Sequence, residues 1–247
     1  MSSFYYQAGA AAPAPFALAS GEPPRAVVFD LDGTLIDADV TVDWTDWLYR
    51  EGVVTDPCYR RSTDRMVDDY RRGRLDMQRF LTEMMPSIAG LSADELERLV
   101  ERFIASVIAP SAFPEGKRAV WRAKAAGIPV MILSASATFL VKAAARVFDV
   151  EDAVGIDLVE KNGIPTDRIE GIMTFREGKV ARLESLGIPP EKVYFFTDSR
   201  NDLPLALRAG GVTVVNPDPL LEGEARGRGW PVLHWERRRR ASESAAS

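Results

Sequence analysis

Cysteine and histidine each occur once in this chain of 247 residues, and their scarcity narrows the chemistry it can perform. The single cysteine, Cys58, excludes a disulfide within the chain and favours a reducing compartment, so we expect a cytoplasmic location. The single histidine, His234, stands near the C-terminus, which argues against a histidine-based metal site or a Ser-His-Asp triad. Catalysis therefore has to rely on carboxylates, hydroxyls, lysine and, where needed, a metal ion.

The chain also lacks long apolar runs and an excess of positive charge. No run reaches the roughly 18 to 20 residues that span a bilayer, so we expect no membrane partner. The Ala/Pro-rich start has no basic region, which argues against a signal peptide. The net charge of −5 gives no reason to expect nucleic acid as a partner. A small phosphorylated metabolite remains a compatible partner, because a local site can be positive in an acidic protein. We expect a monomer or a homodimer.

The two ends of the chain have compositions typical of disorder. Residues 1–24 are predicted to form a disordered arm, and residues 236–247 a disordered basic and serine-rich tail. Arg237 to Arg240 in the tail are interpreted either as a solvated charged end or as a contact for an anionic partner. A core domain is then expected from residues 25–36 and 111–235.

Short apolar runs in the core alternate with amphipathic helical patterns. Strands are predicted where runs are rich in β-branched and aromatic residues, at 26–32, 128–136, 192–199 and 211–218. Because these runs are continuously apolar, we expect them to be buried on both faces of a parallel sheet. Helices are predicted at 114–127, 137–148 and 203–210. The pattern indicates an α/β fold with a doubly wound, Rossmann-like parallel sheet.

Residues 37–110 break this alternation, because they contain helical patterns and no clear strand. Amphipathic helices are predicted at 41–52, 58–73, 76–85 and 92–107. Ser92 followed by Glu95 is a capping-box signature for the last of them. An insert at this place can cover the C-terminal ends of the strands, where open α/β sheets bind ligands. We therefore expect residues 37–110 to form an all-helical cap domain.

Polar residues gather directly at the ends of the predicted strands. They are Asp30 and Asp32, then Ser134 and Ser136, then Asp198, Ser199, Asn201 and Asp202. Lys179 opens a predicted helix between the second and third groups, and it is preferred over Lys161 for that reason. Because the carboxyl ends of parallel strands meet at one edge of the sheet, we expect these groups to converge.

Two carboxylates two residues apart, Asp30 and Asp32, repel each other unless a cation lies between them or one stays protonated. Mg²⁺ is the simplest answer, because it commonly takes one or two carboxylates together with substrate phosphate. We expect Asp30 and Asp198 to hold it. An ionised Asp can also attack phosphorus and form an aspartyl-phosphate.

The remaining groups suit the same phosphoryl chemistry. Asp32 is placed to act as general acid and base. Lys179 and the Ser134 hydroxyl can hold the phosphoryl oxygens. Gly33 lets the backbone turn closely around a phosphate.

Four stretches together resemble the motifs of the haloacid dehalogenase (HAD) superfamily of phosphohydrolases. They are DLDGT at 30–34, the serine that closes the second strand, an isolated lysine, and TDSRND at 197–202. The resemblance covers most of residues 25–220, and the insert after the first motif is similar to the cap of the phosphoserine-phosphatase-like subgroup IB. It implies a Mg²⁺-dependent phosphoric monoester hydrolase.

The resemblance also implies a role for each motif residue. Asp30 is the implied nucleophile and metal ligand, and Asp32 the acid and base that ligates the metal through its backbone carbonyl. Asp198 is the other implied metal ligand, and Asp202 supports the metal site. Lys179 neutralises the nucleophile and the phosphoryl charge. The implied substrate contacts are Gly33, Thr34, Ser134, Ala135 and Asn201. Structural explanations remain beside these roles: a turn for the first aspartates, a helix cap for the last two, and a solvated lysine.

The substrate is predicted from the start and middle of the insert. The phosphoserine phosphatases that the chain resembles carry an acidic residue after the first motif, which meets the substrate amine, and Asp39 stands at that place. Met84 occupies the place of their carboxylate-binding arginine, unless Arg71, Arg72 or Arg74 supplies one from another register. Ser134-Ala135-Ser136 replaces their Ser-Gly-Gly. A small amine-bearing ester without a carboxylate therefore fits better, with histidinol phosphate favoured, phosphoserine next, and phosphoethanolamine and phosphocholine also compatible.

Three further interpretations remain open on sequence alone. Trp44 and Trp47 are interpreted either as packing inside the cap or as a platform for a substrate ring or cation. The same motifs suit a phosphotransferase that uses an acceptor other than water. A non-catalytic binding module on a HAD-like scaffold is the third alternative.

Overall fold

The computed structural model describes residues 16–56 and 76–236. Its centre is a sheet of six parallel strands in the order β3-β2-β1-β6-β7-β8. Their bounds are β1 Ala26–Phe29, β2 Val130–Ala137, β3 Asp152–Ile156, β6 Val193–Thr197, β7 Gly211–Val215 and β8 Val232–Leu233. Helices flank the sheet, which confirms the predicted α/β fold.

The four predicted strands form the four neighbours β2-β1-β6-β7. Every residue of β1 is buried, as a continuously apolar strand in a parallel sheet requires. The helices of the core are α6 Pro114–Ala125, α7 Thr138–Ala145, α8 Glu177–Ser185, α9 Leu203–Ala206 and α10 Pro219–Arg228. Apolar residues between these helices and the sheet are buried, and one of the clusters that they form also includes buried residues from 40–48 and 77–108.

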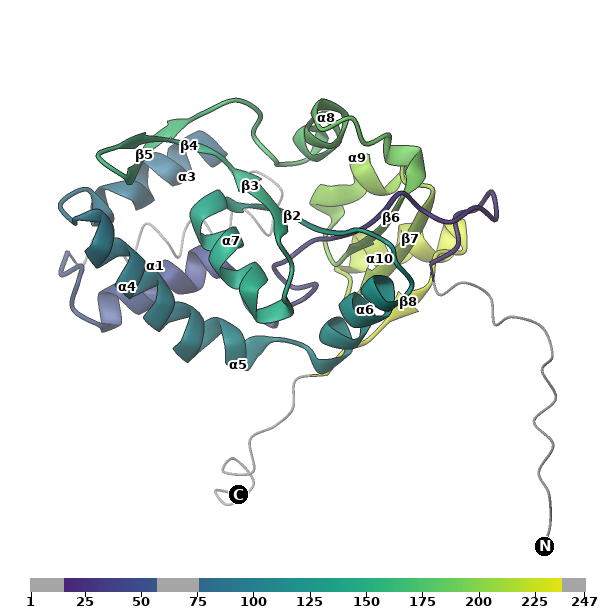
Figure 1. Cartoon of the computed structure of the whole chain (residues 1–247), viewed down its shortest axis with the longest axis horizontal. Coiled ribbons are helices and arrows are strands. Elements are labelled where there is room, and N and C mark those ends of the chain that lie inside the picture. Colours follow the sequence, from purple (N-terminus) through teal and green to yellow (C-terminus); the bar gives the residue numbers. More distant parts are fainter. Residues whose placement is uncertain (1–15, 57–75, 237–247) are drawn as a thin grey trace, which may run out of the picture.

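The described part of the expected cap, residues 37–56 and 76–110, contains helices and no strand. Its helices are α1 Val40–Arg50, α3 Met77–Met84, α4 Ala93–Phe103 with a π-helical continuation Ile104–Ile108, and the start of α5 Ala109–Ser111. Figure 1 shows α1, α3 and α4 together at one end of the molecule, away from α9 and α10. The capping box of Ser92 and Glu95 is present at the start of α4. The helix predicted at 58–73 lies outside the described residues.

Two tryptophans of α1 pack against the neighbouring helices. Trp44 and Trp47 are buried, their rings stack with centroids 5.6 Å apart, and both contact Phe103 of α4. Trp44 also meets Phe139 of α7 edge-on at 6.4 Å. The packing interpretation of these residues therefore holds, because stacked rings covered by other aromatics leave no open platform for a ligand.

A β-hairpin lies beside α3. Strands β4 Leu158–Lys161 and β5 Ile164–Ile169 pair antiparallel around Asn162-Gly163, whose φ angles of 55° and 75° suit a two-residue hairpin turn. Figure 1 places the hairpin beside α3, and Gln78 of α3 donates to the Asp167 carbonyl at 2.8 Å. The sequence interpretation missed this hairpin, together with the short strands β3 and β8.

The beginning of the described chain corrects the prediction of a disordered arm over residues 1–24. Phe16 and Leu18 are buried, and the Phe16 ring contacts Tyr194 and Phe196 of β6 edge-on. The Ala19 N–H donates to the Gly210 carbonyl at 2.7 Å. Residues 16–24 are therefore held against the core by apolar burial that the Ala/Pro-rich composition did not reveal. The tail, apart from Glu236, lies outside the described residues. No helix in the described ranges has the length and apolar character of a membrane span.

Candidate active site

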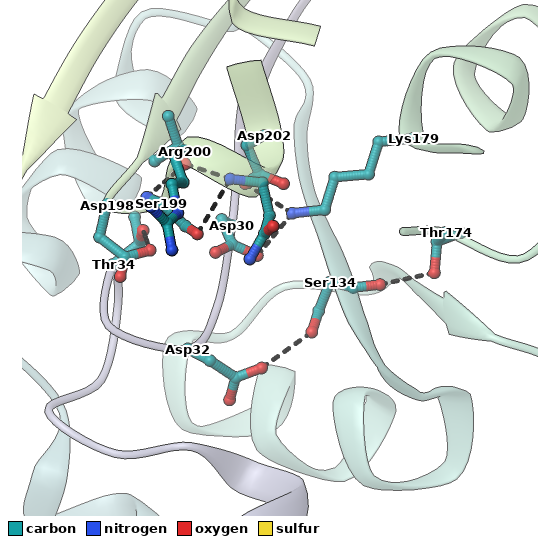
Figure 2. A network of polar contacts seen from close by, with 12 residues as sticks. Asp30, Asp32, Thr34, Ser134, Thr174, Lys179, Asp198, Ser199, Arg200 and Asp202 are labelled. Carbon is teal, nitrogen blue, oxygen red and sulfur yellow. Dashed lines mark hydrogen bonds and ion pairs between the residues drawn. The ribbon is translucent and has the colours of Figure 1, made fainter. Parts of the chain in front are cut away.

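The candidate site lies where β1, β2 and β6 end, as their parallel arrangement predicts. Asp30 follows β1 directly, and its backbone N–H donates to the Phe196 carbonyl of β6 at 2.9 Å. Figure 2 shows Asp30 between Asp198 and Lys179, with Asp32 and Ser134 below them in the view. The structure thus gathers side chains that are up to 172 residues apart in the sequence, from Asp30 to Asp202.

Lys179 forms the buried centre of this network. It lies in the first turn of α8, only 1% exposed, and its Nζ is 2.8 Å from Asp30 Oδ1 and 2.7 Å from Asp202 Oδ2. Burial by itself lowers the pKa of Lys179, but the charges of Asp202 and Asp30 outweigh burial and raise that pKa. The structure thus brings Lys179 to the aspartates, whereas Lys161 lies exposed in the hairpin.

Asp202 directly faces the lysine. Its Oδ2 accepts hydrogen bonds from Lys179 and, at 2.9 Å, from the hydroxyl of Thr197. Burial is the main reason that the pKa of Asp202 rises to about 6, and Lys179 limits that rise. The structure thus places Asp202 on Lys179, whereas the role implied by the sequence, support of the metal site, stays a prediction.

Asp198 lies beside Asp30 and close to the first turn after β1. The Thr34 hydroxyl donates to Asp198 Oδ1 at 3.1 Å, so in this structure Thr34 contacts the aspartate. Gly33 has a φ of 71°, and a Cβ there would come within 2.2 Å of Asp198 Oδ2. Burial, and then repulsion from Asp30 and Asp202, raise the pKa of Asp198 well above its usual value. Gly33 is therefore required both for its backbone conformation and for the close approach of Asp198.

The carboxylates of Asp30 and Asp198 suit a hard divalent cation. Asp30 is buried and Asp198 is partly buried. Desolvation, and then repulsion from Asp30, raise the pKa of Asp198, so a cation between the two carboxylates would relieve an unfavourable charge. Within the described ranges no three acidic, histidine or cysteine side chains converge as a metal cage. Mg²⁺ commonly binds through only one or two carboxylates and keeps the remaining positions for water and substrate oxygens, so this donor set fits it.

Asp32 is held on the side of the site away from Lys179. Its Oδ2 accepts from the hydroxyls of Ser134 at 3.0 Å and Ser136 at 2.9 Å, and its Oδ1 accepts from the Val40 N–H at the start of α1 at 2.7 Å. Burial, followed by the charge of Asp39, raises the pKa of Asp32 to about 7. A carboxyl group with a pKa near neutrality can both donate and accept a proton at physiological pH.

Asp39 is the N-cap of α1. Its Oδ1 accepts from the N–H groups of Thr41 and Val42 at 3.1 and 3.0 Å. Burial is the main reason that the pKa of Asp39 rises to about 6. The structure therefore gives Asp39 a capping function that the sequence interpretation did not mention, beside its expected contact with a substrate amine.

The remaining predicted residues lie around this network or outside the described residues. Asn201 is buried and lines, with Asp198 and Arg200, a cavity of about 410 Å³ beside the strand ends. Ala135 lies between the two serines of β2 and is half-buried. Met84 ends α3, and Arg71, Arg72, Arg74 and Cys58 lie outside the described residues.

Three contacting residues were not on the predicted list of site residues. Ser136 was noted among the polar residues at the strand ends and as a departure from the Ser-Gly-Gly pattern, but it was given no role, although alternation along a strand puts it on the same face as Ser134. Thr197 donates to Asp202, and Thr174 donates to the Ser134 carbonyl at 2.6 Å. Thr197 could have been predicted as a site residue, because it directly precedes Asp198 in the sequence. No sequence pattern marks Thr174, because a long loop carries it to β2.

Comparisons with known proteins identify the family to which the chain is similar. The family model described as haloacid dehalogenase-like hydrolase matches residues 27–207. The chain is 31% identical over 221 residues to a histidinol-phosphatase of Neisseria meningitidis serogroup C, covering 85% of this chain and 98% of that protein. It is 27% identical over 208 residues to a phosphoserine phosphatase of Archaeoglobus fulgidus, covering 82% and 56% of the two chains. A crystal structure of a protein of unknown function from Bordetella pertussis is 34% identical, with a TM-score of 0.78 over 86% of this chain and 99% of that one.

Proposed function

This chain belongs to the haloacid dehalogenase-like hydrolase family and is a phosphoric monoester hydrolase, and from that premise we propose a Mg²⁺-dependent reaction through an aspartyl-phosphate on Asp30. The observation that carries the proposal is the position of Asp30. Its buried carboxylate lies at the end of β1, 2.8 Å from the Lys179 ammonium and beside Asp198. A nucleophile in that place has a cation to keep it ionised and a neighbour with which to share a metal ion.

The proposed reaction has two steps. In the first, an Asp30 carboxylate oxygen attacks phosphorus, the ester P–O bond breaks, and the leaving-group oxygen takes a proton from Asp32. In the second, water attacks the phosphorus of the aspartyl-phosphate and gives its proton to Asp32, while the Asp30 carboxylate departs and phosphate is released. The pKa of Asp32, about 7, suits both proton transfers.

The other residues bind and orient the phosphoryl group. Lys179 balances the charge that Asp30 and the phosphoryl oxygens bring together, and Asp202 keeps Lys179 in place. Ser134, Thr34 and Asn201 are the proposed donors to the phosphoryl oxygens. The side chains of Asp30 and Asp198 and the carbonyl of Asp32 would hold Mg²⁺, which supplies positive charge against the phosphoryl oxygens.

Histidinol phosphate is the proposed substrate, with phosphoserine second. The similarity to a protein named histidinol-phosphatase, over 85% of this chain and 98% of that protein, supports this order. Asp39 and Asp43 also supply negative charge at the start of α1, which suits a substrate amine. The proposal includes the division into a core of residues 25–36 and 111–235 and a cap of residues 37–110. It includes a cytoplasmic location, which rests on the single cysteine, and a monomer or homodimer.

Release of inorganic phosphate, measured with and without Mg²⁺, tests the proposal. The panel comprises histidinol phosphate, phosphoserine, phosphoethanolamine, phosphocholine, sugar phosphates and p-nitrophenyl phosphate. We expect Mg²⁺-dependent turnover, the highest kcat/KM for histidinol phosphate, and complete loss of turnover in Asp30→Asn. A much higher kcat/KM for phosphoserine would refute the substrate assignment. Absence of turnover on the whole panel would favour a binding module, and phosphorylated product with an added alcohol would reveal transfer to an acceptor other than water.

A further inference from the structure

Ser136 contacts two residues of the proposed reaction, Asp32 and Ser134, but has no role in the reaction as proposed above. It stands on β2, two residues after Ser134, and it is buried. Its hydroxyl donates to Asp32 Oδ2 at 2.9 Å, and its backbone N–H donates to Ser134 Oγ at 3.0 Å. Ser136 thus touches both the general acid and base and the hydroxyl proposed to bind phosphate.

The Ser134 hydroxyl cannot serve both of its proposed partners at once. A serine hydroxyl has one proton to donate. In this structure it is donated to Asp32 Oδ2 over 3.0 Å. Once Ser134 turns that proton towards a phosphoryl oxygen, Asp32 loses one of its three donors, and Ser136 and the Val40 N–H remain.

We propose that Ser136 is a positioning residue that keeps Asp32 oriented for proton transfer while Ser134 binds the phosphoryl group. This inference rests on the proposed phosphatase function. The Val40 N–H fixes one carboxyl oxygen of Asp32 and Ser136 fixes the other. The position on Oδ2 that Ser134 vacates is then open, and the proton of Asp32 passes from there to the leaving-group oxygen as the Asp30 oxygen–phosphorus bond forms and the ester P–O bond breaks.

The backbone around Ser136 is closely packed, so its hydroxyl is held in position. The pairing of β2 with β3 shifts register between Leu133 and Ala137, which includes Ser136. On β3, a Cβ at Gly155 would come within 2.3 Å of the Ser136 carbonyl oxygen, so the two backbones approach more closely than any other residue at position 155 permits.

The test compares how two kinds of ester respond to the loss of the Ser136 hydroxyl. The alkoxide leaving group of an alkyl phosphate needs a proton, whereas p-nitrophenolate departs as a stable anion. We therefore measure kcat/KM for p-nitrophenyl phosphate and for the alkyl ester of the panel that the wild-type protein hydrolyses fastest. Ser136→Ala is expected to lower kcat/KM for the alkyl ester by roughly 10- to 100-fold, the range that loss of a hydrogen bond to a charged group gives. The loss for p-nitrophenyl phosphate is expected to be at least about tenfold smaller.

Two further variants separate positioning from a general effect on the fold. Ser136→Thr keeps a hydroxyl and is expected to restore most of the activity on the alkyl ester. Thr213→Val removes another buried hydroxyl of the same sheet, which contacts the Tyr194 hydroxyl at 2.8 Å, and is expected to change both substrates equally.

Equal losses on the two substrates in Ser136→Ala, or no loss on either, would overturn the inference and leave the proposed function intact. A wild-type protein that hydrolyses no alkyl ester would show instead that the proposed function is wrong, and this inference with it.

Discussion

Replacing Lys179 by methionine is the sharpest test of how the site is held together. The Lys179 side chain is buried, with its ammonium 2.8 Å from Asp30 and 2.7 Å from Asp202. Methionine has a similar length and no charge, so the substitution leaves two buried carboxylates facing an uncharged group. Removing one partner of a buried ion pair typically costs about 3–5 kcal/mol of unfolding free energy. For a chain of this size, that cost corresponds to a fall in Tm of about 6–20 °C.

The assay is thermal and urea unfolding at pH 8 in the presence of EDTA, so that no divalent cation replaces the missing charge. The loss should also depend on pH. Burial raises the pKa values of Asp30 and Asp202, and Lys179 lowers both, so without the lysine both carboxyl groups take up protons more readily. Protonation removes the unpaired charge. The variant is therefore expected to recover part of its stability as the pH falls from about 8 to 5.

Lys192→Met is the matched control. Lys192 pairs with Glu22 at the surface, where the two side chains are 43% and 58% exposed. Exposed ion pairs contribute little, because water and salt screen them, so we expect no resolvable change in Tm. The reasoning is refuted if Lys179→Met destabilises the protein no more than Lys192→Met does, or if its destabilisation grows as the pH falls.

Three further predictions concern the aspartates and the backbone. Asp198→Asn is expected to stabilise the metal-free protein at pH 8, because burial, and then repulsion from Asp30, raise the pKa of Asp198. The same substitution is expected to abolish the rise in Tm that Mg²⁺ causes, and an unchanged Mg²⁺ response would contradict the role of Asp198 as a ligand. The pKa values of Asp32 (about 7), Asp39 and Asp202 (both about 6) are raised, so the folded state binds more protons than the unfolded state between about pH 4 and 7. The unfolding free energy of the metal-free protein should therefore fall as pH rises through that window, and a rise in a urea series would count against these shifts. Gly178→Ala should lower both Tm and kcat/KM, because its Cβ would lie 1.7 Å from the Met173 carbonyl oxygen and displace Lys179; Gly223→Ala in α10, with open space around it, should be neutral or stabilising by about 0.5–1 kcal/mol.

The core strands and the polar residues at their ends could be predicted from the sequence alone. Runs such as AVVF are too short and too rich in β-branched residues for helices, and their continuous apolarity requires burial on both faces, so a parallel sheet follows. Once the sheet is parallel, Asp30, Ser134 and Asp198 must meet at one edge. The capping box of Ser92 and Glu95 could be predicted equally well, because it depends on two residues that are three apart at the start of one helix.

Weak or non-local signals explain what the sequence interpretation missed. β8 is two residues long and β3 begins at an exposed aspartate, so neither carries the apolar run by which the other strands were found. The hairpin could have been predicted from Asn162-Gly163, but its contact with α3 joins residues that are 89 apart in the sequence. Residues 16–24 lie against the sheet because the Phe16 ring packs against Tyr194 and Phe196. No local sequence pattern predicts a contact between residues so far apart in the chain.

The pairing of the charged groups at the site depends on the tertiary structure and could not be predicted from the sequence. From the sequence, Lys179 was one of two candidate lysines and Asp202 a supporting residue near the metal; the fold puts the Lys179 ammonium between Asp30 and Asp202. It likewise turns Asp32 towards Ser134, Ser136 and the start of α1 rather than towards Asp30. The sequence is enough to predict which side chains reach the edge of the sheet, because that depends on where each strand ends and on the alternation of side chains along it. Differences of a few tenths of an ångström decide which of these side chains form hydrogen bonds or ion pairs with one another. Those differences depend on how the helices pack against the sheet.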